Sequence, residues 1–212
     1  MPFLVAIVVL GANLAANRLA PGAHLLIGIA VVPGLALIAR AAGLTRAELG
    51  LGRWRDGLRW GGIPALALAA GYGLLLVVPP ARDVLERADG QSWPAVVLAV
   101  LLVIPVGTVL AEELAFRGVL WALVRRRAGT AAATAISSVL FGLWHVLPAL
   151  GAGPANEIVG GATAVRVAAT VVVTGIAGVG FCWLRVRSGS LLAPALLHWA
   201  VNGLGLLAVQ VA

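Results

Sequence analysis

The sequence predicts an all-α fold, a polytopic membrane protein built as a bundle of about seven transmembrane helices. Three observations predict it. Of the 212 residues, 61% are hydrophobic and only 11% are charged, whereas a soluble domain carries roughly 25% charged residues. The mean hydropathy is +1.04. The apolar residues also gather in runs of about 20, the length that a helix needs to cross a bilayer.

Seven apolar runs qualify as membrane spans or come close to it. The first is the shortest, and because no basic segment precedes it we interpret it as a membrane helix rather than a signal peptide. The fourth is too long for one straight span, and Pro105 followed by Gly107 offers a kink within it. No repeat or soluble domain interrupts the series, so residues 1–212 are predicted to form a single membrane domain. The runs cover residues 2–17, 22–39, 58–78, 94–124, 130–147, 164–184 and 189–210.

The arginines predict the orientation, because the chain contains no lysine. If loop 40–59 is cytoplasmic, ten of the arginines lie inside and four outside, which is the bias expected of a multi-pass protein. The amino terminus is then cytoplasmic and the carboxyl terminus outside. Segment 44–57 is expected to form a short interfacial helix. Since the arginines lie in short clusters between apolar runs, we expect no nucleic-acid partner.

Polar residues from three of the predicted helices lie at similar depth. Counted from the cytoplasmic helix ends at the rise of an α-helix, Glu112 lies about 20 Å deep and His145 about 22 Å deep. By the same rise His198 lies about 14 Å deep and Asn202 about 20 Å deep. These four residues therefore share one layer of the hydrocarbon core. An unpaired charge at such depth costs about 2.5–3.5 kcal/mol on insertion scales, so it marks a functional site.

Part of this polar cluster is predicted to be paired within one helix. Glu113 and Arg117 are four residues apart with the acid first, the favourable order for an ion pair, and we interpret them as a structural couple. Glu112 points about 100° away from that face. We therefore expect it to find another partner, with His145 of the fifth span the natural one. His24, alone near the outer end of the second span, is interpreted as a hydrogen-bonding core residue.

These residue types allow hydrolysis of an amide bond inside the bilayer. A carboxylate beside an imidazole can take a proton from water as a general base, and a second imidazole with an amide can stabilise an oxyanion. Other protease chemistries lack their residues: the motifs H-E-x-x-H and G-x-S-x-G are absent. All three aspartates fall in predicted loops, and no base stands beside Cys182. The glutamate–histidine set therefore remains as the candidate catalytic group.

Three short motifs carry a resemblance to a known family. "EELAFR" (Glu112, Glu113, Arg117), "FGLWH" (Phe141, His145) and "HWAVN" (His198, Asn202) resemble the E-E-x-x-x-R, F-x-x-x-H and H-x-x-x-N motifs of the CAAX protease and bacteriocin-processing family of intramembrane proteases. The likeness covers residues 100–202. It implies that Glu112 and His145 activate a water molecule and that His198 and Asn202 form an oxyanion hole. Glu113, Arg117 and Phe141 would support the site.

The resemblance leaves the substrate and the metal question open. It implies a membrane-associated peptide or protein substrate and no cofactor, although two histidines and a glutamate could also hold zinc. The use of arginine without lysine, together with abundant Ala, Gly and Val, is typical of a protein from a high-GC bacterial genome. We therefore expect a bacterial inner-membrane protein, for which a prenylated substrate is disfavoured. The alternatives are a catalytically silent immunity or scaffold protein of the same fold, and a solute or proton transporter, against which the absence of an internal repeat argues.

Overall fold

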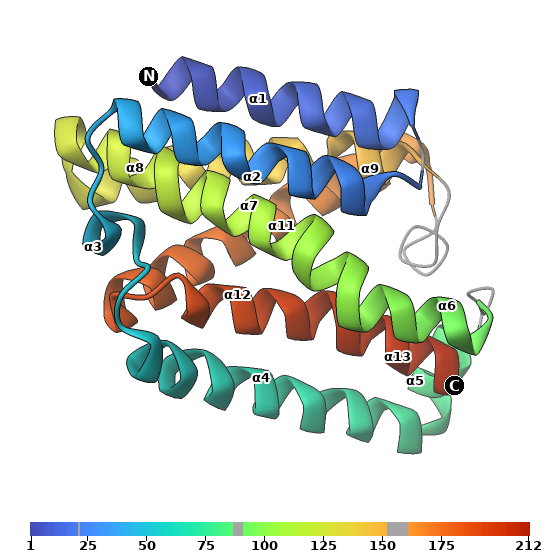
Figure 1. Ribbon diagram of the computed structural model, residues 1–212. Helices are drawn as coiled ribbons and strands as arrows, with labels where there is room; N and C mark the ends of the chain where they lie inside the picture. Colours follow the sequence, from blue (N-terminus) through green and yellow to red (C-terminus); the bar gives the residue numbers. More distant parts are fainter. Residues whose placement is uncertain (21, 87–90, 152–160) are drawn as a thin grey trace.

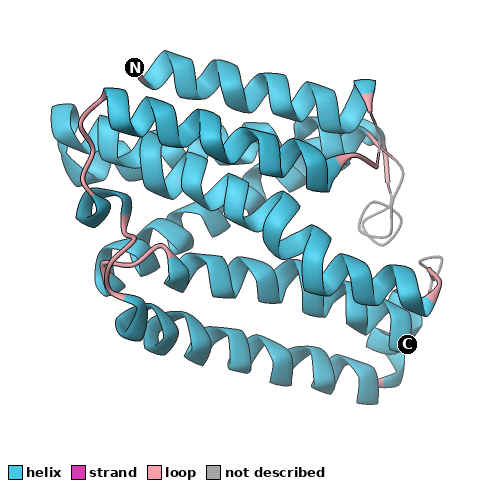
Figure 2. Cartoon of the chain, viewed as in Figure 1, coloured by secondary structure: helices cyan, strands magenta, loops and turns pink. Residues whose placement is uncertain are grey.

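The computed structural model describes residues 1–20, 22–86, 91–151 and 161–212, and within these ranges all regular structure is helical (Figures 1 and 2). Four stretches within the long helices have the wider π-helical turn: Ala15–Leu19, Ala99–Leu110, Leu114–Leu120 and Ala200–Leu204. The α-helices are α1 (Pro2–Leu14), α2 (His24–Ala41), α3 (Arg46–Leu49), α4 (Trp54–Val77), α5 (Pro79–Leu85), α6 (Trp93–Leu98), α7 (Ala111–Glu113), α8 (Trp121–Trp144), α9 (Val146–Leu150), α11 (Thr163–Ser188), α12 (Leu192–Trp199) and α13 (Gly205–Val211).

Six helices of the described ranges are long and apolar enough to cross a membrane, and the fourth, Trp93–Leu150, runs for 58 residues. That helix is broken at Gly129, where φ is 79° and ψ is 178°. Beyond Gly129 the chain returns along the arm it came from: Trp121 Nε1 donates to Thr134 Oγ1 at 3.4 Å, and Ser137 Oγ donates to the Phe116 carbonyl at 2.9 Å. The two arms are therefore the predicted runs 94–124 and 130–147.

Proline and glycine act differently in this long hairpin. The helix continues through Pro105, which lies within the π-helical stretch Ala99–Leu110; a proline has no N–H to donate, and a wider turn accommodates the missing bond. The reversal falls at Gly129, since a positive φ is accessible to glycine without steric cost.

The predicted interfacial helix 44–57 is much shorter in the structure. Only α3 is helical before the chain turns at Gly50, whose φ is 77°. Thr45 and Glu48 form a capping box at the start of α3, which satisfies free backbone N–H groups there. The remaining residues from Trp54 onward belong to α4. α3 is thus a one-turn connector between two membrane helices.

The helices pack as neighbouring pairs around the long hairpin. α1 lies on α2, α2 lies along Ala99–Leu110, α8 packs on α11, and α12 packs on α4 and α11 (Figure 1). The contact between α2 and Ala99–Leu110 brings two backbones together: a Cβ on Gly28 would collide with the backbone of Gly107, and a Cβ on Gly107 would lie 2.7 Å from Leu25 Cα. Close approach through small residues is how helices associate in lipid.

Candidate active site

Three helical segments bring the predicted site residues together inside the bundle. Glu112 and Glu113 lie in α7, which is a single short α-helical piece between two π-helical stretches. His145 follows the last residue of α8, and His198 lies in α12. Glu112, Glu113 and His198 are 7%, 0% and 3% exposed. A π-helical turn displaces the side chains that follow it around the helix axis, and such turns are frequent at functional sites.

Glu113 and Arg117 form the predicted ion pair. Arg117 Nη1 donates to Glu113 Oε1 at 3.0 Å, and both side chains are fully buried. The guanidinium lies over aromatic rings, with its central carbon 4.0 Å from the ring centre of Phe141 and 4.9 Å from that of Phe181. These cation–π contacts stabilise the positive charge where water is excluded. Phe141 therefore packs against Arg117, and its ring centre also lies 4.7 Å from that of His145.

His198 bridges the two glutamates. Its Nδ1 lies 2.8 Å from Glu113 Oε1 and its Nε2 lies 3.8 Å from Glu112 Oε2. The imidazole stacks on Phe181, with ring centres 5.1 Å apart and planes 22° apart. A carboxylate accepts hydrogen bonds only, so the short contact assigns the Nδ1 proton to the bond with Glu113. His198 is thereby held in one orientation, with Nε2 directed at Glu112.

Glu112 does not form the expected hydrogen bond with His145. Instead Trp144, the residue before that histidine, donates its indole N–H to Glu112 Oε1 at 3.0 Å. The Nδ1 of His145 lies 2.8 Å from the carbonyl of Phe141 one turn earlier. If Nδ1 donates there, Nε2 is left as a free acceptor. The other oxygen of Glu112, Oε2, is buried and has no hydrogen-bond partner within the described residues.

A cavity of about 320 Å³ lies beside this cluster. Glu112, His145 and Asn202 line it, and the side chain of Asn202 makes no hydrogen bond with any described residue. His198 does not line it. The opposite wall comes from α1, α2 and the π-helical stretch Ala15–Leu19 between them, and includes His24, Asn17 and Gly28. The site is therefore a hollow between the two amino-terminal helices and the long hairpin, with an acid, an imidazole and an amide on one wall.

Sequence reasoning missed two groups of residues around this hollow. The first is Trp144, which lies between two residues of the "FGLWH" motif and could have been noticed as an indole donor. The second is the amino-terminal wall, where His24 lines the cavity instead of lying in the core. Asn13 Nδ2 donates to the Trp144 carbonyl at 2.8 Å and so ties α1 to the site. No motif marks this wall, because which face of α1 and α2 turns inward depends on packing.

The described ranges contain no group of three or more His, Cys, Asp or Glu side chains arranged to hold a metal ion. His198 Nδ1 is engaged by Glu113, and His145 Nδ1 by the carbonyl of Phe141. The expectation that the protein uses no cofactor stays a prediction.

Fold and site together define a polytopic membrane protein with a buried glutamate–histidine cluster next to an internal cavity. The family described as "Type II CAAX prenyl endopeptidase Rce1-like" matches residues 92–204. The chain belongs to this family of CAAX-type intramembrane proteases, and the match spans all three motifs. No curated protein and no solved structure matched the chain.

Proposed function

We propose that the protein is an intramembrane endopeptidase that hydrolyses a peptide bond of a membrane-associated protein or peptide. One observation carries the proposal: Glu112, buried at 7% exposure, lines a cavity of about 320 Å³ together with His145 and Asn202. A carboxylate that lines a cavity can take the proton of a water molecule bound there. The membership of a protease family supports the same reaction class.

In this proposal Glu112 takes the proton of the attacking water. Trp144 fixes Glu112 Oε1 by its 3.0 Å hydrogen bond, which leaves Oε2 for the reaction. His145 assists, since a lone pair on its Nε2 can accept a hydrogen bond from the same water. Asn202, with an amide that no described residue engages, supplies a donor for the oxyanion.

His198 acts through the glutamates in this proposal. Its Nε2 faces Glu112 Oε2 at 3.8 Å, and the 2.8 Å contact of its Nδ1 with Glu113 Oε1 fixes the ring. His198 is therefore a positioning residue beside the reacting carboxylate. The role of an oxyanion donor, expected from the motif, would require His198 to reach a cavity that it does not line.

The test compares the termini of membrane proteins in the native host by mass spectrometry. Glu112→Gln keeps the side-chain volume and removes the base; Glu86→Gln makes the same change in an exposed ion pair with Arg82, far from the site. We expect a small set of termini near membrane spans to disappear in Glu112→Gln and to persist in Glu86→Gln. Loss of a general base lowers a rate by about 10²–10⁴-fold, so the disappearance should be nearly complete.

Two other results would contradict the proposal. Unchanged termini in a normally accumulated Glu112→Gln protein would favour the silent immunity or scaffold protein. The same termini lost in both variants would mean that their production depends on protein level and not on the carboxylate of Glu112.

A further inference from the structure

A second cavity lies at the other end of the bundle from the α1–α2 loop, where α3 connects α2 to α4. It has a volume of about 420 Å³ and contains three arginines, Arg53, Arg125 and Arg185, with the indole of Trp121. We call it the arginine cavity. It lies at the face that the arginine distribution predicts to be cytoplasmic, and the chemistry of the proposed protease does not use it.

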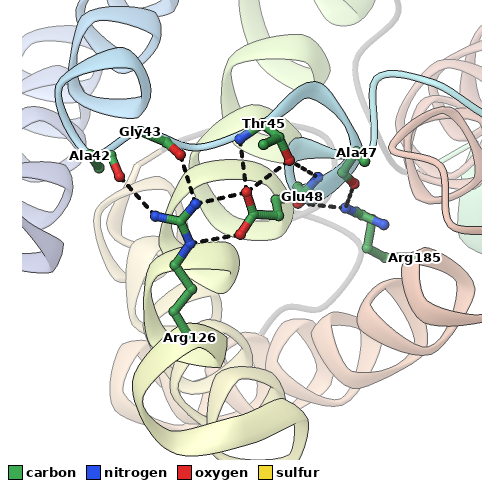
Figure 3. Close-up of polar contacts among 7 residues, drawn as sticks. All are labelled: Ala42, Gly43, Thr45, Ala47, Glu48, Arg126 and Arg185. Carbon is green, nitrogen blue, oxygen red and sulfur yellow. Dashed lines mark hydrogen bonds and ion pairs between the residues drawn. The ribbon is translucent and has the colours of Figure 1, made fainter.

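The nearby carboxylates are already engaged. Arg126 binds Glu48 with two hydrogen bonds of 2.6 and 2.8 Å and also donates to the carbonyls of Ala42 and Gly43 (Figure 3). Arg53 binds Asp56 at 2.8 Å. Arg125 and Arg185, by contrast, have no carboxylate partner within the described residues. The cavity therefore carries positive charge that the surrounding chain leaves uncompensated.

Arg185 is the least satisfied of these cations. It is 3% exposed, and its Nη2 donates to the Glu48 carbonyl at 2.8 Å and to that of Ala47 at 3.4 Å (Figure 3). Its buried Nε has no hydrogen-bond partner in the described ranges. A guanidinium has five N–H donors, and a buried one without an anion is costly. The carbonyls of Ala47 and Glu48 accept hydrogen bonds from only one nitrogen of this guanidinium group.

Arg125 and Arg185 share one aromatic neighbour. Their guanidinium carbons are 5.2 and 5.4 Å from the centre of the same Trp121 ring, and both residues line the arginine cavity. An anion in the cavity would compensate both charges and accept hydrogen bonds from the unmet donors. The hydroxyl-bearing Thr130 lines the same cavity and offers a further donor.

We propose that the arginine cavity binds a phosphate group, held by Arg125 and Arg185, with Arg53 at its rim. Arginine matches phosphate geometry with paired N–H donors, and basic pockets between membrane helices at the cytoplasmic face bind lipid head groups. The phosphate can come from an anionic lipid or from a soluble phosphate. Because Arg185 holds the α3 connector, occupancy would also fix α2 relative to α4.

The experiment titrates short-chain phosphatidylglycerol or inorganic phosphate into the purified protein in a neutral detergent and follows the Tm. Arg125→Gln removes an exposed charge that lines the cavity; Arg127→Gln removes the same charge two residues away, outside the lining. Binding to the folded state raises Tm. We expect Arg125→Gln to weaken the apparent affinity about fivefold, as for loss of about 1 kcal/mol, and Arg127→Gln to leave it unchanged.

The source of the phosphate follows from the two ligands. Stabilisation by the lipid at concentrations where inorganic phosphate has no effect identifies a lipid site, and equal stabilisation by inorganic phosphate identifies a soluble ligand. The proposal is overturned if neither ligand raises Tm, or if the two arginine variants weaken binding equally, since the effect would then be general surface charge.

Discussion

Neighbouring residues in one short helix have different surroundings in this protein. Glu113 lies wholly inside, between Arg117 and His198, whereas Glu112 lies against Trp144 and lines the cavity. The first carboxylate has two cationic or potentially cationic partners at 3.0 and 2.8 Å. The second has one neutral donor and a distant imidazole. Substitution of Glu113 should therefore affect folding, whereas substitution of Glu112 should affect activity.

The prediction at this scale is that Glu113→Gln destabilises the protein far more than Glu112→Gln. The first change leaves Arg117 buried at 0% exposure without a counter-charge, and breaking a buried pair in this way costs about 3–5 kcal/mol. Thermal unfolding in detergent measures the difference. Equal Tm values for the two variants would mean that the Glu113–Arg117 pair does not hold the fold.

At the scale of elements, the wall formed by α2 depends on a backbone contact. Gly28 touches the backbone of Gly107, whereas Gly34, on the same helix, has open space where a Cβ would stand. We predict that Gly28→Ala pushes α2 off the hairpin and costs about 1–3 kcal/mol. Gly34→Ala should instead be neutral or stabilising by up to about 1 kcal/mol.

Thermal unfolding of the two alanine variants, with accessibility of the cavity to a small apolar probe, checks this prediction. A loss of stability in Gly34→Ala as large as in Gly28→Ala would show that both glycines matter for helix flexibility and not for contact.

The sequence predicted the helices better than it predicted their contacts. Run lengths gave the spans, and the spacing of Glu113 and Arg117 gave their pair, because both signals are local. The hydrogen bond from Trp144 to Glu112 could not be derived, since it depends on the rotation of α8 after the reversal at Gly129. The cavity wall of α1 and α2 was missed for the same reason, as it follows from the close approach of Gly28 and Gly107.

At the scale of the whole molecule, the helices alternate in direction, and the two termini lie at opposite ends of the bundle (Figure 1). We predict a cytoplasmic amino terminus and an external carboxyl terminus, because ten arginines then lie inside. A carboxyl-terminal alkaline phosphatase fusion should be active and the matching green fluorescent protein fusion dark. The reverse pattern would invert the protein in the membrane and move the arginine cavity to the outer face.

The one-residue reversal at Gly129 bears on how the chain enters the bilayer during synthesis. Its two arms can leave the translocon together as a helical hairpin, and the Glu113–Arg117 couple can form within the first arm as soon as that helix exists. The pair can then enter the lipid as a nearly neutral unit, which costs less free energy than inserting the two charges separately. Glu112 enters beside it with Trp144 arriving on the returning arm, and His198 joins last, when α12 is made. We therefore expect the charged cluster to assemble in the order of synthesis, with the Glu113–Arg117 pair first and His198 last.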